Sequence, residues 1–270
     1  MKKLFFPLIF CTSFLSFAQL QDTKIADECM KKADYPCAEK AYADLALKEK
    51  ISKLKAQHLN NLGTSQRRLG KTAEAFKSYE TAMIFDALNW ETYLNLSSLH
   101  AARGSKEKAL DIIKKGLEIN PENAELYLIR AKVYEDLKKN DLAEKDYQYL
   151  QNSAPENFIA KTNYALFKKN IGRLNESLKD YNQLISEKPE SLLYNNRADV
   201  YLALKKYKEA SSDVEKAIKM DPKFSIAYLT KAKLQMETGK EKEGCETLDK
   251  AVKLGYERYL ILDLLKKCGK

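Results

Sequence analysis

The stretch Tyr194-Asn195-Asn196-Arg197-Ala198-Asp199-Val200-Tyr201, followed by Lys216-Ala217-Ile218-Lys219-Met220-Asp221-Pro222, decides the fold. Its central pair, a larger residue before a small one, recurs along the chain at Leu62-Gly63, Leu96-Ser97, Arg130-Ala131, Tyr164-Ala165, Arg197-Ala198 and Lys231-Ala232. The successive steps are 34, 34, 34, 33 and 34 residues. A fixed period of this length is typical of repeat architectures, in which each unit is one small motif stacked on the next.

Each unit repeats more than this one pair. Twelve residues after the first small residue comes a second one, at Ala75, Ala109, Ala143, Ser177, Ala210 and Gly244. Four residues later comes a larger, mostly apolar residue, at Tyr79, Ile113, Tyr147, Tyr181, Val214 and Leu248. Glycines recur between the two patterns at Gly70, Gly104, Gly172 and Gly239, and prolines close four units at Pro121, Pro155, Pro189 and Pro222. Because Gly ends helices and Pro cannot continue them, each unit is predicted to be a pair of antiparallel helices.

These residues resemble the tetratricopeptide repeat family, and the resemblance covers residues 56–258 in six units. It implies an all-α fold, a right-handed superhelical solenoid of antiparallel helix pairs. A degenerate repeat is expected upstream at 19–55, where Ala26, Ala38 and Tyr42 keep the spacing. Residues 257–270 are expected to form a C-terminal capping helix that covers the last apolar face, as a solenoid requires.

The N-terminus has the pattern of a secretory signal peptide. Basic Met1-Lys2-Lys3 precedes the almost wholly apolar stretch Leu4 to Phe17, and Ser16-Phe17-Ala18 places small residues at −3 and −1. We expect cleavage after Ala18, a signal peptide at 1–18, and a mature protein in the periplasm or cell envelope of a Gram-negative bacterium. A membrane anchor is the alternative, although the apolar run is shorter than the roughly 20 residues that a span needs.

Four cysteines remain after removal of the signal peptide, and an exported protein uses cysteines for disulfides. On the repeat pattern, Cys245 and Cys268 lie about 15 and 18 Å from the turn at Gly255 on antiparallel helices. Cys29 and Cys37 flank the turn at residues 34–36 in the same way. We predict the disulfides Cys29–Cys37 and Cys245–Cys268, with buried free thiols as the alternative.

The resemblance also implies a binding surface, because in this family the first helix of each unit lines a concave groove. The positions that match are Asn60, Thr64, Arg67, Leu94, Ser98, Leu128, Lys132, Glu135, Thr162, Leu166, Asn195, Asp199, Leu202, Leu229, Lys233 and Met236. This mixture suits an extended peptide or a partner helix. Family members that bind a carboxy-terminal carboxylate use Lys, Asn and Arg. Here Asn196 matches, but Ile226 and Thr230 replace the cations, which argues against that ligand.

Two further positions predict ion pairs within repeats. Arg130 lies 16 residues before Asp146, and Arg197 lies 16 residues before Asp213. The repeat pattern places each Arg on the first helix of a repeat and each Asp on the second helix of the same repeat. Both pairs are therefore expected to tie the two helices of one repeat together.

Chemistry for catalysis is not evident in the 270 residues. The only histidines are His58 and His100, and no zinc-protease, nucleophile-elbow or phosphate-loop motif occurs. We expect no enzyme activity, no cofactor and no metal. The net charge of +9 is not arranged as a basic and aromatic stripe, so nucleic acid is not an expected ligand.

The predicted function is a non-catalytic scaffold or adaptor that binds another protein or peptide in the groove. The alternative is a periplasmic, chaperone-like handler of unfolded or outer-membrane proteins. A scaffold binds one partner tightly, whereas a handler binds many chains weakly.

Overall fold

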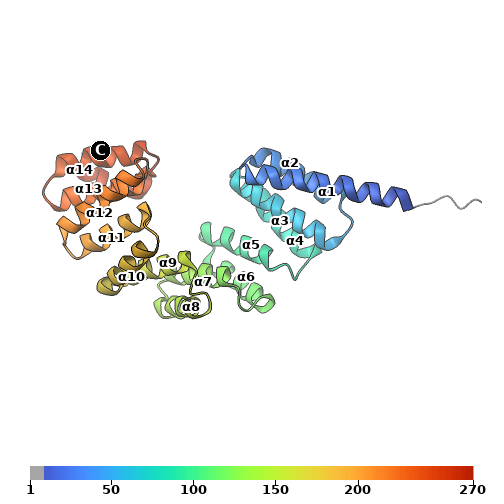
Figure 1. The fold of residues 1–270 in the computed structure, drawn as a ribbon, viewed down its shortest axis with the longest axis horizontal. Coiled ribbons are helices and arrows are strands. Elements are labelled where there is room, and N and C mark those ends of the chain that lie inside the picture. The colour runs from blue at the N-terminus through green and yellow to red at the C-terminus, as the bar shows by residue number, and fades with distance from the viewer. Residues whose placement is uncertain (1–8, 270) are drawn as a thin grey trace, which may run out of the picture. The chain divides into compact units, whose positions relative to one another are not determined.

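The computed structural model describes residues 9–269, with side chains from Leu20 onward, and divides the chain into two compact units. Unit 1 ends at Lys139 and unit 2 begins at Asn140 (Figure 1). Every regular element in the described part is a helix, in tandem pairs, as the repeat predicts. The boundary between the units falls inside the fourth helix pair, between its two helices.

Unit 1 contains seven helices, connected by short turns. They are α1 (Ile9–Lys31), α2 (Tyr35–Lys48), α3 (Ser52–Arg68), α4 (Thr72–Phe85), α5 (Trp90–Ala102), α6 (Lys106–Ile119) and α7 (Ala124–Asp136). The expected cleavage point after Ala18 falls within α1, and residues 1–8 of the expected signal peptide lie outside the described residues. None of the helices between residues 9 and 269 combines the length and apolar character needed to span a bilayer.

Unit 2 continues the same arrangement. Its elements are α8 (Asn140–Ser153), α9 (Phe158–Asn170), α10 (Leu174–Glu187), α11 (Ser191–Ala203), α12 (Tyr207–Met220), α13 (Ser225–Glu237), α14 (Glu241–Lys253), the 3₁₀ turn η1 (Arg258–Ile261) and α15 (Leu262–Lys267). The prolines act as expected: α6, α8, α10 and α12 each end two residues before Pro121, Pro155, Pro189 and Pro222.

The turn inside each pair requires one residue with left-handed backbone. Gly70, Gly104, Gly172 and Gly239 have φ between 76° and 85°, which confirms their predicted role at the ends of first helices. The remaining pairs use Ala33, Lys138 and Lys205 at the same place, with φ of 57–59°. The left-handed turn is therefore a property of the repeat geometry, which non-glycine residues adopt at some cost.

The small residues let the paired helices approach closely. A Cβ atom on Gly63 would lie 2.7 Å from the ring of Tyr79, which is fully buried. In unit 2 Tyr181 occupies the equivalent place and is also fully buried, next to Ala165. This packing of small against large residues across each pair builds the core of both units.

Asparagines begin three of the first helices. The side chains of Asn89, Asn123 and Asn157 accept hydrogen bonds from the backbone N–H groups of Thr92, Leu126 and Ala160, at 3.3, 2.8 and 3.0 Å. Each bond satisfies a donor that the first turn of a helix leaves free.

The C-terminal cap differs from the single helix expected at 257–270. A 3₁₀ turn over Arg258–Ile261 precedes the short helix α15, and the backbone changes direction at Ile261 (φ −128°, ψ 22°). Tight 3₁₀ turns are common at helix ends. This turn brings Ile261 and Leu265 onto Leu248 and Ala251 of α14, so the cap still covers the last apolar face.

Candidate functional site: the groove faces of the two units

The first helices of consecutive repeats lie next to one another within each unit. In unit 1 the side-chain amide of Asn95 on α5 donates to Asn60 Oδ1 on α3, at 3.0 Å. In unit 2 Lys169 on α9 forms an ion pair with Asp199 on α11. Residues at the same repeat position on such neighbouring helices share one face, which we call the groove face of each unit.

The unit 1 groove face is largely occupied with its own hydrogen bonds. The Thr64 hydroxyl lies 3.1 Å from both Asn60 O and the Tyr79 hydroxyl, and Ser98 donates to Leu94 O at 2.8 Å. Lys132 is exposed. The sequence places Arg67, Leu94, Leu128 and Glu135 on this face too, and all four are half-buried. On this face the hydroxyls of Thr64 and Ser98 are therefore already hydrogen-bonded, whereas the Lys132 side chain is exposed.

The unit 2 groove face is more apolar. Leu166, Leu202 and Met236 are half-buried, and so are Thr162, Lys233 and Asp199. The Thr162 hydroxyl donates to Phe158 O at 2.8 Å. Lys169 on α9 and Asp199 on α11 neutralise each other in an ion pair.

Three of the expected groove residues do not present an accessible side chain. Asn60 and Asn195 are each 3% exposed and Leu229 is 5% exposed. Asn60 is covered because Asn95 bonds to it from the next helix, whereas Leu229 packs with Ala232 and Leu248. The Oδ1 atom of Asn195 forms no hydrogen bond with any described residue. These three positions support the face rather than contact a partner directly.

Sequence reasoning missed a row of exposed aliphatic residues on the unit 2 groove face. Ile159, Leu192 and Ile226 are the second residues of α9, α11 and α13, and they are 62%, 40% and 41% exposed. Their spacing of 33 and 34 residues was the available signal. The corresponding residues of unit 1 are Gln57, Glu91 and Glu125.

The carboxylate-binding cations are missing from this face, as the sequence indicated. Ile226 is an exposed aliphatic residue, and Thr230 is buried with its hydroxyl donating to Ile226 O at 3.3 Å. Asn196 receives a 3.4 Å hydrogen bond from Asn195 Nδ2. The arrangement suits an uncharged or apolar segment rather than a chain terminus.

One predicted ion pair joins α11, whose first-helix position contributes to the unit 2 groove face, to α12. The Arg197 guanidinium on α11 donates to both carboxylate oxygens of Asp213 on α12, at 2.7 and 2.8 Å, which confirms that pair. The Asp213 carboxylate raises the pKa of Arg197, so the cation is held at any physiological pH. Arg130 lies at the end of unit 1 and Asp146 in unit 2, because the boundary between the units divides their repeat. Their pairing stays a prediction.

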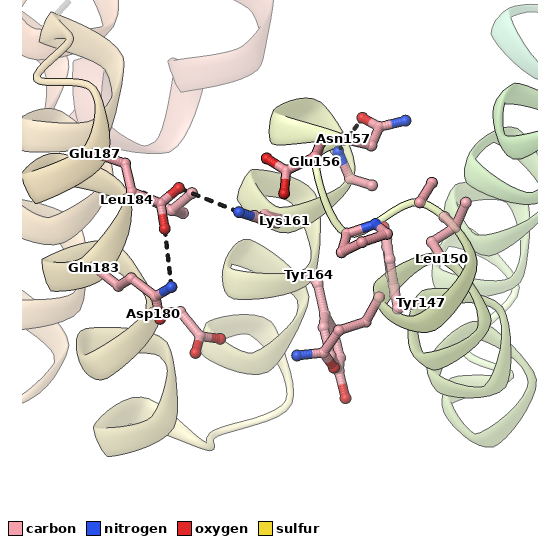
Figure 2. A pocket seen from close by; sticks show the side chains of 14 residues that line it. Tyr147, Leu150, Glu156, Asn157, Lys161, Tyr164, Asp180, Gln183, Leu184 and Glu187 are labelled. Atoms are coloured by element: carbon pink, nitrogen blue, oxygen red, sulfur yellow. Dashed lines mark hydrogen bonds and ion pairs between the residues drawn. The ribbon is translucent and has the colours of Figure 1, made fainter.

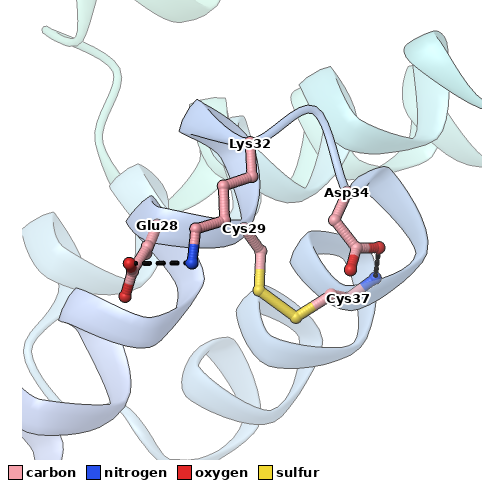
Figure 3. Close-up of a disulfide and its surroundings, with 5 residues drawn as sticks. All are labelled: Glu28, Cys29, Lys32, Asp34 and Cys37. Atoms are coloured by element: carbon pink, nitrogen blue, oxygen red, sulfur yellow. Dashed lines mark hydrogen bonds and ion pairs between the residues drawn. A yellow bond between two sulfur atoms is a disulfide. The ribbon is translucent and has the colours of Figure 1, made fainter.

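The cysteines lie where the repeat pattern placed them. Cys29 and Cys37 are joined across the turn between α1 and α2, with Cα atoms 5.8 Å apart (Figure 3). Cys245 and Cys268 join α14 to the residue after α15, with Cα atoms 5.7 Å apart. Both separations lie within the limit for a disulfide. Oxidation of the two pairs in the cell stays a prediction.

Among the side chains described, which begin at Leu20, no group of three or more His, Cys, Asp or Glu residues is placed to hold a metal ion.

Comparison with known proteins identifies the repeat. Two tetratricopeptide repeat models match residues 91–123 and 191–224. A tetratricopeptide repeat protein from Parabacteroides merdae is 30% identical in sequence, with a TM-score of 0.80 over 93% of this chain and 99% of that one. The chain belongs to the tetratricopeptide repeat family. Proteins of this family are generally non-catalytic scaffolds that bind other proteins or peptides.

More distant relatives share the repeat alone. The crystal structure of YrrB, a tetratricopeptide repeat protein with an unusual peptide-binding site, has 20% identity and a TM-score of 0.51, over 72% of this chain and 99% of that chain. The Hsp70-Hsp90 organizing protein of Triticum aestivum is 31% identical over 94 residues, which are 34% of this chain and 16% of that protein. A DnaJ homolog of Schizosaccharomyces pombe is 25% identical over 78% of this chain and 45% of its own length. The chain thus spans less than half of these two curated relatives.

Proposed function

We propose that this protein is an exported, non-catalytic scaffold of the bacterial cell envelope that binds a segment of a partner protein on the unit 2 groove face. The proposal for export rests on the signal-peptide pattern at 1–18. The proposal for binding rests on the family and on the chemistry of the exposed face.

The observation that carries the binding site is the aliphatic row of Ile159, Leu192 and Ile226. These side chains are exposed at one repeat position on three consecutive first helices, although the same position in unit 1 is polar or acidic. Exposed apolar residues that recur in a line mark an interaction surface more often than scattered ones do. With half-buried Leu166 and Leu202 beside them, they suit the apolar side of an extended peptide or partner helix.

A chaperone-like function is the second candidate, and the same row favours it. An aliphatic row that lacks the carboxylate-binding cations does not require one particular sequence, so it suits unfolded segments of many chains. Two curated relatives, the Hsp70-Hsp90 organizing protein and the DnaJ homolog, are named for the chaperone machinery, which agrees with this class of partner. The scaffold differs in binding one partner with high affinity.

In-cell crosslinking separates the two functions. A photo-crosslinking residue is placed at Ile159 or Leu192, both exposed, rather than at buried Asn195. The control carries it at exposed Glu209 on α12. One dominant adduct from the groove positions supports the scaffold, and a broad set of envelope proteins supports the handler. Adducts no different from those at Glu209 would exclude the unit 2 face.

A matched pair of variants tests the surface itself. Ile159→Glu/Leu192→Glu/Ile226→Glu adds three charges to the face and is expected to abolish the adducts formed through a photo-crosslinking residue at half-buried Leu166. Leu47→Glu, at an 80% exposed leucine of α2, makes the same chemical change outside the groove faces and leaves them intact. Export is tested separately by determining the N-terminal residue of the mature chain, which is expected to be Gln19.

A further inference from the structure

A cavity lies in unit 2, away from its groove face. It has a volume of about 770 Å³ and is enclosed by the end of α8, the loop before α9, and one side each of α9 and α10 (Figure 2). Its volume is in the range of small-ligand sites. None of the groove residues of α9 lines it, because Ala160, Lys161 and Tyr164 belong to a different side of that helix than Ile159, Thr162 and Leu166.

The deep part of the cavity is aromatic and aliphatic. The rings of Tyr147 and Tyr164 stack with centroids 5.3 Å apart and planes 13° from parallel. Leu150, Leu184 and Pro155 add apolar surface. The Tyr164 ring also faces the Lys168 ammonium, whose Nζ lies 4.3 Å from the ring centroid, in a cation–π contact.

The rim of the cavity is acidic. Three carboxylates line it, those of Glu156, Asp180 and Glu187, against the single ammonium of Lys161. Lys161 lies 3.2 Å from Glu187, which also accepts a 2.9 Å hydrogen bond from Gln183, and Asp180 is paired with Lys168 at 2.7 Å. Glu156 forms no ion pair with the described residues. The chain as a whole carries a net charge of +9, so this acidic lining is not its average surface.

We propose that this cavity binds an arginine side chain presented by a partner protein. A guanidinium has a planar fork that can bond both oxygens of Glu187, displacing the ammonium of Lys161, which provides only one point of contact. The aliphatic stem of the arginine packs on Leu184 and Pro155. Glu187, Lys161 and Asp180 have side chains 37%, 30% and 30% exposed, so an incoming side chain can reach them.

The probe for this site is a short blocked peptide, acetyl-Gly-Leu-Arg-Gly-amide, compared with the same peptide carrying Gln in place of Arg. Affinity is measured by calorimetry on the purified chain, and the contact is located by backbone amide NMR shifts. The Arg peptide is expected to bind about tenfold more tightly than the Gln peptide, since it adds charge-assisted hydrogen bonds. The shifts are expected at residues 156–164 and 180–187.

Two variants with opposite effects guard against a folding artefact. Glu156→Gln/Glu187→Gln is expected to weaken the Arg peptide about tenfold and to leave the Gln peptide unchanged. Lys161→Met removes the internal competitor for Glu187 and is expected to tighten the Arg peptide. Glu209→Gln, at an exposed first-turn carboxylate of α12, is the matched control and changes neither.

Several results would overturn the arginine site. Equal affinity of the two peptides, shifts outside the cavity, or no binding of the Arg peptide at about 10 mM would each do so. The cavity shares no residue with the groove face, so such a failure leaves the proposed function standing. Conversely, loss of groove crosslinks does not alter the expectation here.

Discussion

Unit 1 and unit 2 are built from one repeat, yet they place different chemistry at the same positions. The repeat position five residues before the larger residue of each pair holds Gln57, Glu91 or Glu125 in unit 1, whereas in unit 2 it holds an exposed aliphatic residue. At one core position Tyr79 and Tyr181 fill equivalent places and both are fully buried, and other repeats bury Ile113, Val214 or Leu248 there. Both units thus bury a large side chain at this core position, while the exposed position differs in chemistry between them.

The two units also differ in the polar groups that they bury. Unit 1 contains both histidines of the chain, His58 and His100, each 6% exposed. Unit 2 instead holds the Arg197–Asp213 ion pair between α11 and α12. Unit 1 therefore contains buried histidines whose pKa is lowered by burial, and unit 2 contains an ion pair.

The largest loss of stability is expected when a buried core tyrosine of one unit is truncated, and the other unit serves as the comparison. Tyr79→Ala in unit 1 and Tyr181→Ala in unit 2 each remove a fully buried ring, at a cost of about 3–5 kcal/mol. Because each repeat of a solenoid contacts only its neighbours, the loss should stay within the mutated unit. Hydrogen exchange of α3–α5 and of α9–α11 measures the two separately. Tyr79→Phe, which keeps the ring, is the control, and equal loss in both units would show that they unfold as one.

Much of this architecture could be predicted from the sequence, for identifiable reasons. The period of 33 or 34 residues located the helix pairs, and Gly70 or Pro121 marked helix ends, because these signals are local to the chain. Burial on the groove face could not be read in the same way. Asn60 is covered only because Asn95 reaches it from the next helix, and the cavity beside Tyr164 depends on the spacing of α8, α9 and α10.

The next largest effect concerns the two ends, one in each unit. Cys29→Ser opens a loop of sequence separation 8, and Cys245→Ser opens one of 23. Loop entropy predicts losses of about 2.5 and about 3.5 kcal/mol, and therefore a larger effect at the C-terminus. Peptide mapping without reductant is expected to find both crosslinked peptides, and hydrogen exchange then measures α1–α2 against α14–α15. Free thiols in the exported protein would contradict the pairing.

Acid is expected to weaken unit 1 before unit 2. Burial lowers the pKa of His58, only partly offset by Glu49 and Asp27, and burial also lowers the pKa of His100, with Lys108 acting in the same direction and Glu80 opposing it.

The sign follows from the lowered pKa. The unfolded chain binds protons near pH 6.5 while folded unit 1 resists them, so stability is complete above that pH and falls below it. Hydrogen exchange between pH 7.5 and about 5 is expected to show lost protection in unit 1 alone, above the range where carboxylates titrate. His58→Gln/His100→Gln should remove this pH dependence whatever its effect at pH 7.5. An unchanged acid profile in that variant would assign the effect to other groups.

The smallest changes in stability are expected from two opposite substitutions at left-handed turns, one in each unit. Gly104 in unit 1 has φ of 78°, and a Cβ added there would meet no atom within 4 Å, so Gly104→Ala changes backbone strain without a clash and should cost about 1 kcal/mol. Lys205 in unit 2 already adopts φ of 57°, and Lys205→Gly relieves that strain while making the unfolded chain more flexible. The two terms oppose each other, so the net change should be within about 0.5 kcal/mol. Thermal denaturation of each variant measures the difference. If Lys205→Gly proved as destabilising as Gly104→Ala, the side chain of Lys205 would have to contribute a contact of its own, and the turns of the two units would not be equivalent.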